Sequence, residues 1–192
     1  QASLMEKAFD MHYAWELHHL MNDLSKGHKT LKDLDSYLTK MDTVLATDDI
    51  TMNFITNHDE NSWAGTLEER MPGRKDIFTA LSYTLPGMPL IYSGQEYDLN
   101  HRLKFFEKDS IPKTKGTYFE LLTKLGALKN THPALHGGKS AAAYKRLQTD
   151  NPNIFSFKRG KDGRELCFIG KFSDEPQQVQ VGYGKLYTDY IA

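Results

Sequence analysis

Two periodicities of apolar residues divide the chain into two parts. Up to about residue 132, apolar residues recur every three or four positions in long segments, and short, nearly continuous apolar runs separate these segments. This pattern predicts helices that alternate with buried strands, and therefore a parallel sheet. Beyond His136-Gly137-Gly138 apolar residues alternate with polar ones, which predicts short antiparallel strands.

The first part predicts strands at 7–13, 51–56 and 90–92, with amphipathic helices at 17–24, 31–45, 76–85 and 118–128. Gly27 is expected to end the first helix, and Thr30 with Asp33 is a capping-box-like start for the second. Pro86-Gly87 ends the third helix, and the fourth stops before Pro133.

The second part predicts strands at 141–147, 154–158, 165–169, 177–181 and 185–191. Asp162-Gly163 between two of them is a strong hairpin signal. We therefore place a domain boundary near 134–138, with one domain at 1–136 and another at 137–192.

Polar residues gather where the second strand ends. The apolar run Phe54-Ile55-Thr56 is followed directly by Asn57-His58-Asp59-Glu60-Asn61. In parallel α/β folds the functional groups lie at the carboxyl ends of strands. An imidazole beside a carboxylate there can bind hydroxyls, relay a proton, ligate a metal or knit a loop together, and the strand end alone does not choose among these.

Composition excludes some classes of partner. With 24 basic and 25 acidic residues the formal charge is −1, so we expect neither a nucleic-acid nor a membrane-surface partner. No apolar run approaches the roughly 20 residues that a membrane helix needs. No basic and apolar leader precedes the first element, and the compartment stays open. The single Cys167 excludes an internal disulfide and is expected to pack in a strand.

The strand ends taken together resemble the α-amylase family of glycoside hydrolases. Phe54-Ile55-Thr56-Asn57-His58-Asp59 is similar to the end of barrel strand seven of that family, Phe9-Asp10-Met11 resembles strand six, and the segment from Met88 to Gly94-Gln95-Glu96 resembles strand eight. The loop 100–107 and the helix end 130–135 resemble family segments that lead into a C-terminal β-sandwich. The implied fold is α/β plus all-β, with the last three strand–helix units of a (β/α)8 TIM barrel followed by a small antiparallel β-sandwich.

The resemblance implies roles for three residues. Asp59 is similar to the carboxylate that stabilises the oxocarbenium-like transition state, and His58 to the neighbour that hydrogen-bonds sugar hydroxyls; we place Asn57 with the substrate-binding residues, although its amide is better suited to orienting the turn. The implied substrate is an α-glucan or maltooligosaccharide. The nucleophile, the acid/base and the calcium ligands of the family belong to strands and loops absent from this chain, so we assign it no cofactor and no metal.

Other residues receive structural interpretations. Arg74-Lys75-Asp76 imitates the nucleophile spacing but starts a helix, and we expect Gln95 and Glu96 to hold the barrel rim. His12, Glu16 and His19 match no strong zinc signature. Trp63 is equally suited to stacking on a sugar and to packing over its loop. Tyr183, Tyr187 and Tyr190 are expected in the β-sandwich.

Two further functions compete with that of a glycosidase fragment. The chain alone could be a non-catalytic carbohydrate-binding or structural piece, since it lacks two of the three carboxylates. A metal phosphohydrolase using His58, Asp59 and His18 or His19 is disfavoured because the pair follows a strand. An open piece of barrel sheet exposes its edges, so we also expect self-association or edges covered by the chain itself.

Overall fold

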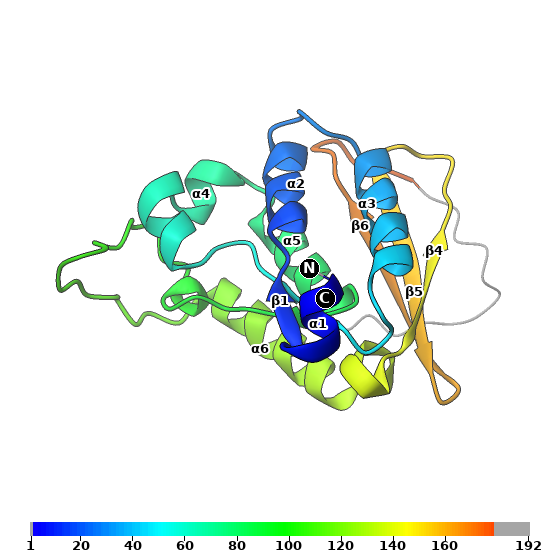
Figure 1. The fold of residues 1–192 in the computed structure, drawn as a ribbon. Helices are drawn as coiled ribbons and strands as arrows, with labels where there is room; N and C mark the ends of the chain where they lie inside the picture. The colour runs from blue at the N-terminus through cyan, green and yellow to red at the C-terminus, as the bar shows by residue number, and fades with distance from the viewer. Residues whose placement is uncertain (1, 179–192) are drawn as a thin grey trace.

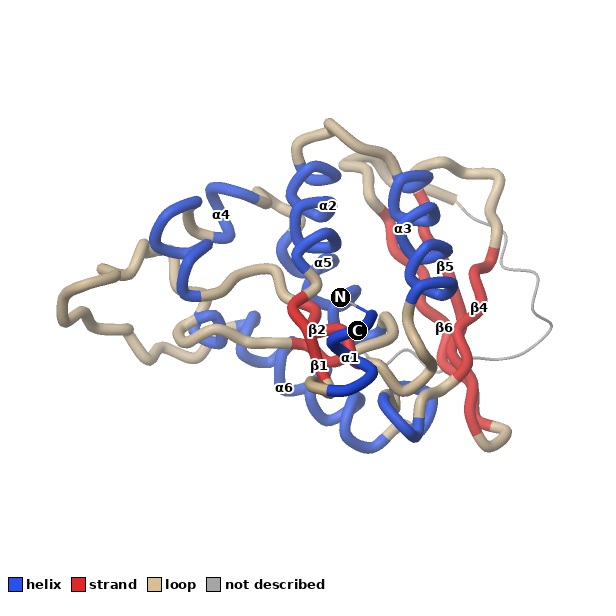
Figure 2. The backbone as a smooth tube through the Cα atoms, in the orientation of Figure 1, coloured by secondary structure: helices blue, strands red, loops and turns tan. Residues whose placement is uncertain are grey.

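A computed structural model describes residues 2–178, which form two separate three-stranded sheets with helices around and between them (Figures 1 and 2). The first sheet is parallel and has the order β1 (Met11–Tyr13), β2 (Ile50–Asn53), β3 (Met88–Pro89). The second is an antiparallel meander of β4 (Ala143–Leu147), β5 (Ile154–Lys161) and β6 (Arg164–Lys171). Mixed α/β architecture with a separate antiparallel sheet is thus confirmed.

The long helices lie close to where their periodicity predicts them. They are α2 (Trp15–Ser25), α3 (Leu31–Val44), α5 (Lys75–Thr84) and α6 (Thr117–Thr131). Gly27 follows the end of α2 with φ of 72°, the left-handed conformation that favours glycine. The predicted capping box of Thr30 and Asp33 starts α3. Shorter elements are α1 (Ala2–Lys7), η1 (Glu60–Ala64), α4 (Leu67–Arg70), η2 (Gln95–Tyr97), η3 (Pro133–Leu135) and η4 (Gly138–Ser140).

The parallel strands are shorter than predicted. The segment 7–13 begins with the end of α1, and its strand starts only at Met11. Strand β2 stops at Asn53, so 54–56 are buried but irregular. The strand predicted at 90–92 lies at Met88–Pro89, and Leu90 N makes one further hydrogen bond, to Asn53 O at 2.8 Å. All three strands end together, which leaves the residues after them without ladder partners.

The hairpin of β5 and β6 forms as predicted, and its turn residues Asp162 and Gly163 both have positive φ, of 52° and 74°. Strand β4 begins two residues later than predicted. Gln177 and Gln178, predicted to start a strand, lie outside any strand. The remainder of that strand, the strand predicted at 185–191 and the three tyrosines assigned to the sandwich lie outside the described residues.

One apolar core packs the helices of the first part of the chain against the antiparallel sheet. It contains Leu17 and Met21 of α2, Leu34 of α3, and Phe155 and Phe157 of β5. Arg146 of β4 adds an ion pair with Asp35 of α3 at 2.7 Å. In Figure 1, α3 lies against the antiparallel sheet. The core therefore spans the boundary expected near 134–138, although the division into two domains remains a prediction.

Two buried cations bind the segments that lead from α5 and α6 towards the antiparallel sheet. Arg159 is 1% exposed and donates to the backbone oxygens of Thr84, His136 and Ala142. Lys129 donates to Gly87 O and Leu135 O at 2.7 and 2.8 Å. Burial lowers the pKa of Lys129 to about 8 and that of Arg159 to about 10. Backbone carbonyl oxygens are thus the hydrogen-bond acceptors of both charges.

Across residues 2–178 no helix is long and apolar enough to span a membrane. Among the strands of residues 2–178, each edge strand of the parallel sheet, β1 and β3, pairs only with β2. Self-association through these edges stays a prediction.

Replacing Arg159 tests how much its buried hydrogen bonds stabilise the packing of the antiparallel sheet against the rest of the chain. Arg159→Ala should lower the free energy of unfolding by about 3 kcal/mol, because three buried carbonyl oxygens lose their donor. Urea denaturation followed by circular dichroism measures the change. Arg164→Ala, at an exposed position of β6, is the matched control and should stay within about 0.5 kcal/mol of wild type. Equal losses in the two variants would show that the buried guanidinium does not stabilise this packing.

Candidate functional site

His58 and Asp59 follow the middle strand of the parallel sheet and are open to solvent. Their side chains are 56% and 46% exposed, and His58 Nε2 lies 3.5 Å from Asp59 Oδ2. They stand in the first turn of a helical segment rather than on the strand itself, because β2 has ended at Asn53. The pair therefore offers an imidazole and a carboxylate to a ligand at the carboxyl side of the sheet.

Asn57 is buried and caps this turn. It is 2% exposed, and its Oδ1 accepts a hydrogen bond from Glu60 N at 2.8 Å. Its backbone oxygen accepts from Asn61 N at 3.0 Å, and its buried Nδ2 has no hydrogen-bond partner among the described residues. The side chain thus orients the turn, as the sequence indicates for an amide at this place, and its role in binding substrate stays a prediction.

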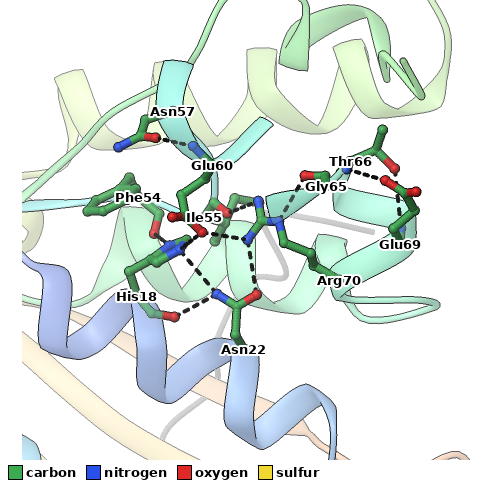
Figure 3. Close-up of polar contacts among 10 residues, drawn as sticks. All are labelled: His18, Asn22, Phe54, Ile55, Asn57, Glu60, Gly65, Thr66, Glu69 and Arg70. Atoms are coloured by element: carbon green, nitrogen blue, oxygen red, sulfur yellow. Dashed lines mark hydrogen bonds and ion pairs between the residues drawn. The ribbon is translucent and has the colours of Figure 1, made fainter. Parts of the chain in front are cut away.

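Behind the turn, Glu60 points inward to a buried histidine that the sequence offers only as an alternative metal ligand and not as a partner of Glu60 (Figure 3). His18 of α2 has no solvent exposure, and its Nε2 lies 2.8 Å from Glu60 Oε2. Its Nδ1 lies 3.2 Å from Phe54 O, and its ring stacks on Phe54 with centroids 4.4 Å apart. A neutral imidazole has one N–H, so it can donate to only one of these two oxygens.

Arg70, at the end of α4, completes this buried network. Its Nε donates to Gly65 O, and its other nitrogens donate to Asn22 Oδ1 and Ile55 O, all between 2.8 and 3.0 Å. Glu60 Oε2 lies 3.9 Å from the guanidinium. Figure 3 shows α2, the chain after β2, and α4 converging on these side chains. The network thereby fixes the turn that carries His58 and Asp59.

Burial sets the electrostatics of the network. It is the main cause that lowers the pKa of His18, and the charge of Arg70 adds to it, while the hydrogen bond and the charge of Glu60 act in the opposite direction. Burial likewise lowers the pKa of Arg70, against the attraction of Glu60 and Glu69. The Glu60 side chain thus lies between the Arg70 guanidinium and the His18 imidazole, whose lowered pKa favours its uncharged form.

The other candidates have structural roles. Gln95 is buried, accepts from Tyr92 N and donates to the Tyr118 hydroxyl, and Glu96 accepts from Gly94 N, while their place at a barrel rim stays a prediction. Asp76 lies in the first turn of α5, which confirms that this motif starts a helix. In the part of the chain that the structure describes, no group of three or more His, Cys, Asp or Glu is placed to bind a metal ion.

Sequence comparison with known proteins relates this chain to one family of enzymes. No protein-family model matches the chain. A cyclomaltodextrin glucanotransferase of Klebsiella oxytoca is 25% identical over 188 residues, which cover 82% of this chain and 28% of that enzyme. Alpha-amylase 1 of Schwanniomyces occidentalis is 23% identical over 145 residues, covering 73% of this chain and 28% of that enzyme. This chain is a distant homologue of the α-amylase family enzymes.

Solved structures share the fold of this α-amylase homologue. A maltogenic α-amylase from Thermotoga neapolitana superposes with a TM-score of 0.74 at 23% identity, over 88% of this chain and 39% of that one. An α-amylase from Lactobacillus plantarum gives 0.71 at 24% identity, over 87% of this chain and 38% of that one. The homologue therefore matches a part of the α-amylase fold, and it spans 28% of the length of the two sequence relatives.

The sequence indicated the exposed pair of the α-amylase homologue but not its support. His18 is a polar residue beside the apolar stripe of its helix, and Arg70 ends the largely charged segment Leu67-Glu68-Glu69-Arg70, which is typical of a solvated face. Their partners lie 42 and 48 positions away in the sequence. No local pattern reveals such pairings.

The pH dependence of stability tests the buried network. Unfolded His18 takes up a proton near about pH 6.5, whereas the folded imidazole takes it up only at lower pH. Stability contributed by neutral His18 is therefore present above about pH 6.5 and is lost as the pH falls through the lowered pKa. The urea midpoint of wild type should fall between about pH 7.5 and pH 5, and His18→Gln should show a smaller fall.

His132, whose pKa is also lowered, adds a fall of the same sign to wild type and variant alike. His28→Gln changes an exposed histidine and should keep the full wild-type decline. An equally steep decline in His18→Gln would contradict the uncharged state of this imidazole.

Proposed function

We propose that this chain is the C-terminal part of an α-amylase-type retaining glycoside hydrolase that acts on α-glucosidic bonds of starch-like glucans or maltooligosaccharides. Residues 1–136 contribute strands six to eight of the (β/α)8 barrel, and 137–192 form a small antiparallel β domain. The observation that carries the proposal is the solvent-open pair of His58 and Asp59 after the middle of three parallel strands, in a chain homologous to this family.

Asp59 stabilises the positive charge that develops at the anomeric centre. Such carboxylates hydrogen-bond sugar hydroxyls, and these bonds strengthen in the oxocarbenium-like transition state. With 46% of its side chain exposed, Asp59 has free surface for such bonds. His58 lies beside it and donates to hydroxyls of the same sugar unit. Asn57 stabilises the turn by accepting a hydrogen bond from Glu60 N.

The chain does not supply the complete catalytic set. A retaining glycosidase needs a nucleophile and an acid/base about 5 Å apart, and the family carries these on strands four and five. Glu60, the carboxylate next to Asp59, is bound by His18 and faces Arg70, so it is held in the buried network. The alternative function, a carbohydrate-binding or structural piece without activity, is therefore the expected behaviour of the isolated chain.

The role of Asp59 is tested in a gene product that joins this chain to the missing barrel strands. Asp59→Asn should lower kcat on an α-glucan by about 10²- to 10³-fold and change KM much less, because the lost contact strengthens in the transition state. Initial rates of reducing-sugar release measure both constants. Asp48→Asn, an exposed aspartate elsewhere, should behave as wild type. Unchanged turnover in Asp59→Asn would refute this role.

The isolated 192-residue chain provides a separate test. It should release no reducing sugar from soluble starch above a buffer blank, because the two reacting carboxylates are absent. Release of sugar by the pure chain, abolished by Asp59→Asn, would show that these residues suffice for catalysis.

A further inference from the structure

Three aromatic rings form an exposed cluster beside the candidate site. Trp63 of η1, Phe105 and Phe106 are 61%, 41% and 85% exposed. The Phe105 centroid lies 5.3 Å from that of Trp63 and 4.9 Å from that of Phe106, so the rings form one continuous surface. Exposing this much aromatic surface in one place is unfavourable in water unless something binds there.

The backbone that carries these rings is firmly anchored. The side chain of Asn61 donates to His101 O and accepts from Leu103 N, and Ser62 Oγ donates to Leu103 O at 2.7 Å. Arg102 forms a bidentate ion pair with Glu69 at 2.9 and 3.0 Å. Figure 1 shows the loop between η2 and α6 running out beyond α4. The exposed rings are therefore held in place by polar contacts made beneath them.

Several polar and charged groups near the rings bind one another. His101 and Lys104 N both bind Asp109, and Lys104 Nζ binds Glu107 at 2.9 Å. Their charges are thereby neutralised locally, which favours an uncharged ligand over an anionic one. The surface is also continuous with the candidate site, since the His58 ring lies 6.2 Å from that of Phe105.

We propose that Trp63, Phe105 and Phe106 form a sugar-stacking platform that binds an α-linked glucan chain next to His58 and Asp59; this rests on the proposed function. Pyranose rings present C–H faces that pack on aromatic rings and hydroxyls that hydrogen-bond to imidazole and carboxylate groups. The platform offers aromatic faces on which the C–H faces of the sugar pack, and the His58–Asp59 pair offers hydrogen-bonding groups for its hydroxyls.

The tilt between the rings favours an α-linked glucan. Trp63 and Phe105 are inclined by 43°, and Phe105 and Phe106 by 73°. Successive units of an α-1,4-glucan turn relative to one another, whereas a β-1,4-glucan is flat and suits coplanar rings. A curved maltooligosaccharide can therefore contact more than one ring of the platform.

Calorimetric titration of the 192-residue chain with maltoheptaose tests the platform. Trp63→Ala and Phe106→Ala should each weaken binding about tenfold, because each removes one stacking surface. Phe9→Ala is the matched control, since Phe9 is 58% exposed on a different segment. The affinity of this variant for maltoheptaose should stay within about twofold of wild type. Circular dichroism should show unchanged folding for Phe106→Ala, whose side chain is almost fully exposed.

Three outcomes would overturn the proposal. The first is maltoheptaose binding that neither Trp63→Ala nor Phe106→Ala weakens. That result would not bear on the role of Asp59, because turnover measures that role. The second is equal affinity for cellohexaose, which would contradict the α-glucan specificity. The third is an absence of maltoheptaose binding together with a dimer in sedimentation velocity that Phe106→Ala dissociates, which would identify a second copy of the chain as the occupant.

Discussion

The end of strand β2 imposes the constraint on which the site depends. After Asn53 both neighbouring strands have ended, so Phe54 and Ile55 continue as buried backbone with no ladder partner. Buried carbonyl oxygens need donors, and here side chains provide them. Arg70 donates to Ile55 O, and His18 Nδ1 lies 3.2 Å from Phe54 O. The buried Arg70 guanidinium then requires an anion, which Glu60 supplies at 3.9 Å, and Glu60 also contacts His18.

This constraint also separates the inward from the outward residues of the turn. Asn57, Glu60 and Asn61 are spaced by three and four positions and bind protein atoms, while His58 and Asp59 between them face solvent. A helical turn produces this division because residues three and four apart share a face. The inward residues provide rigidity, so the outward pair needs no further support of its own to keep its position.

The sequence predicts features that depend on local periodicity, but it does not predict features that depend on contacts between residues far apart in the chain. The stripes of α2 and α3, the capping box at Thr30 and the Asp162-Gly163 turn are all encoded within a few residues. The end of β2 is not encoded locally, because residues 51–56 continue the same strand-like composition past Asn53 and the neighbouring strands β1 and β3 decide where pairing stops. For the site, the Asn-His-Asp motif indicated the solvent-open pair and the turn-forming amide, whereas His18 and Arg70 meet Glu60 only through the tertiary fold.

Helix α2 links the antiparallel sheet to the candidate site. Leu17 and Met21 belong to the same apolar core as Phe155 and Phe157 of β5, whereas His18 and Asn22, each one position further along, belong to the polar network. Movement of the antiparallel sheet against α2 would therefore displace the donors that hold the turn. The buried guanidinium of Arg159 on β5, which donates to Thr84 O at the end of α5 and to two further carbonyl oxygens, opposes such movement. The second sheet thus contributes to the geometry of His58 and Asp59 without touching either residue.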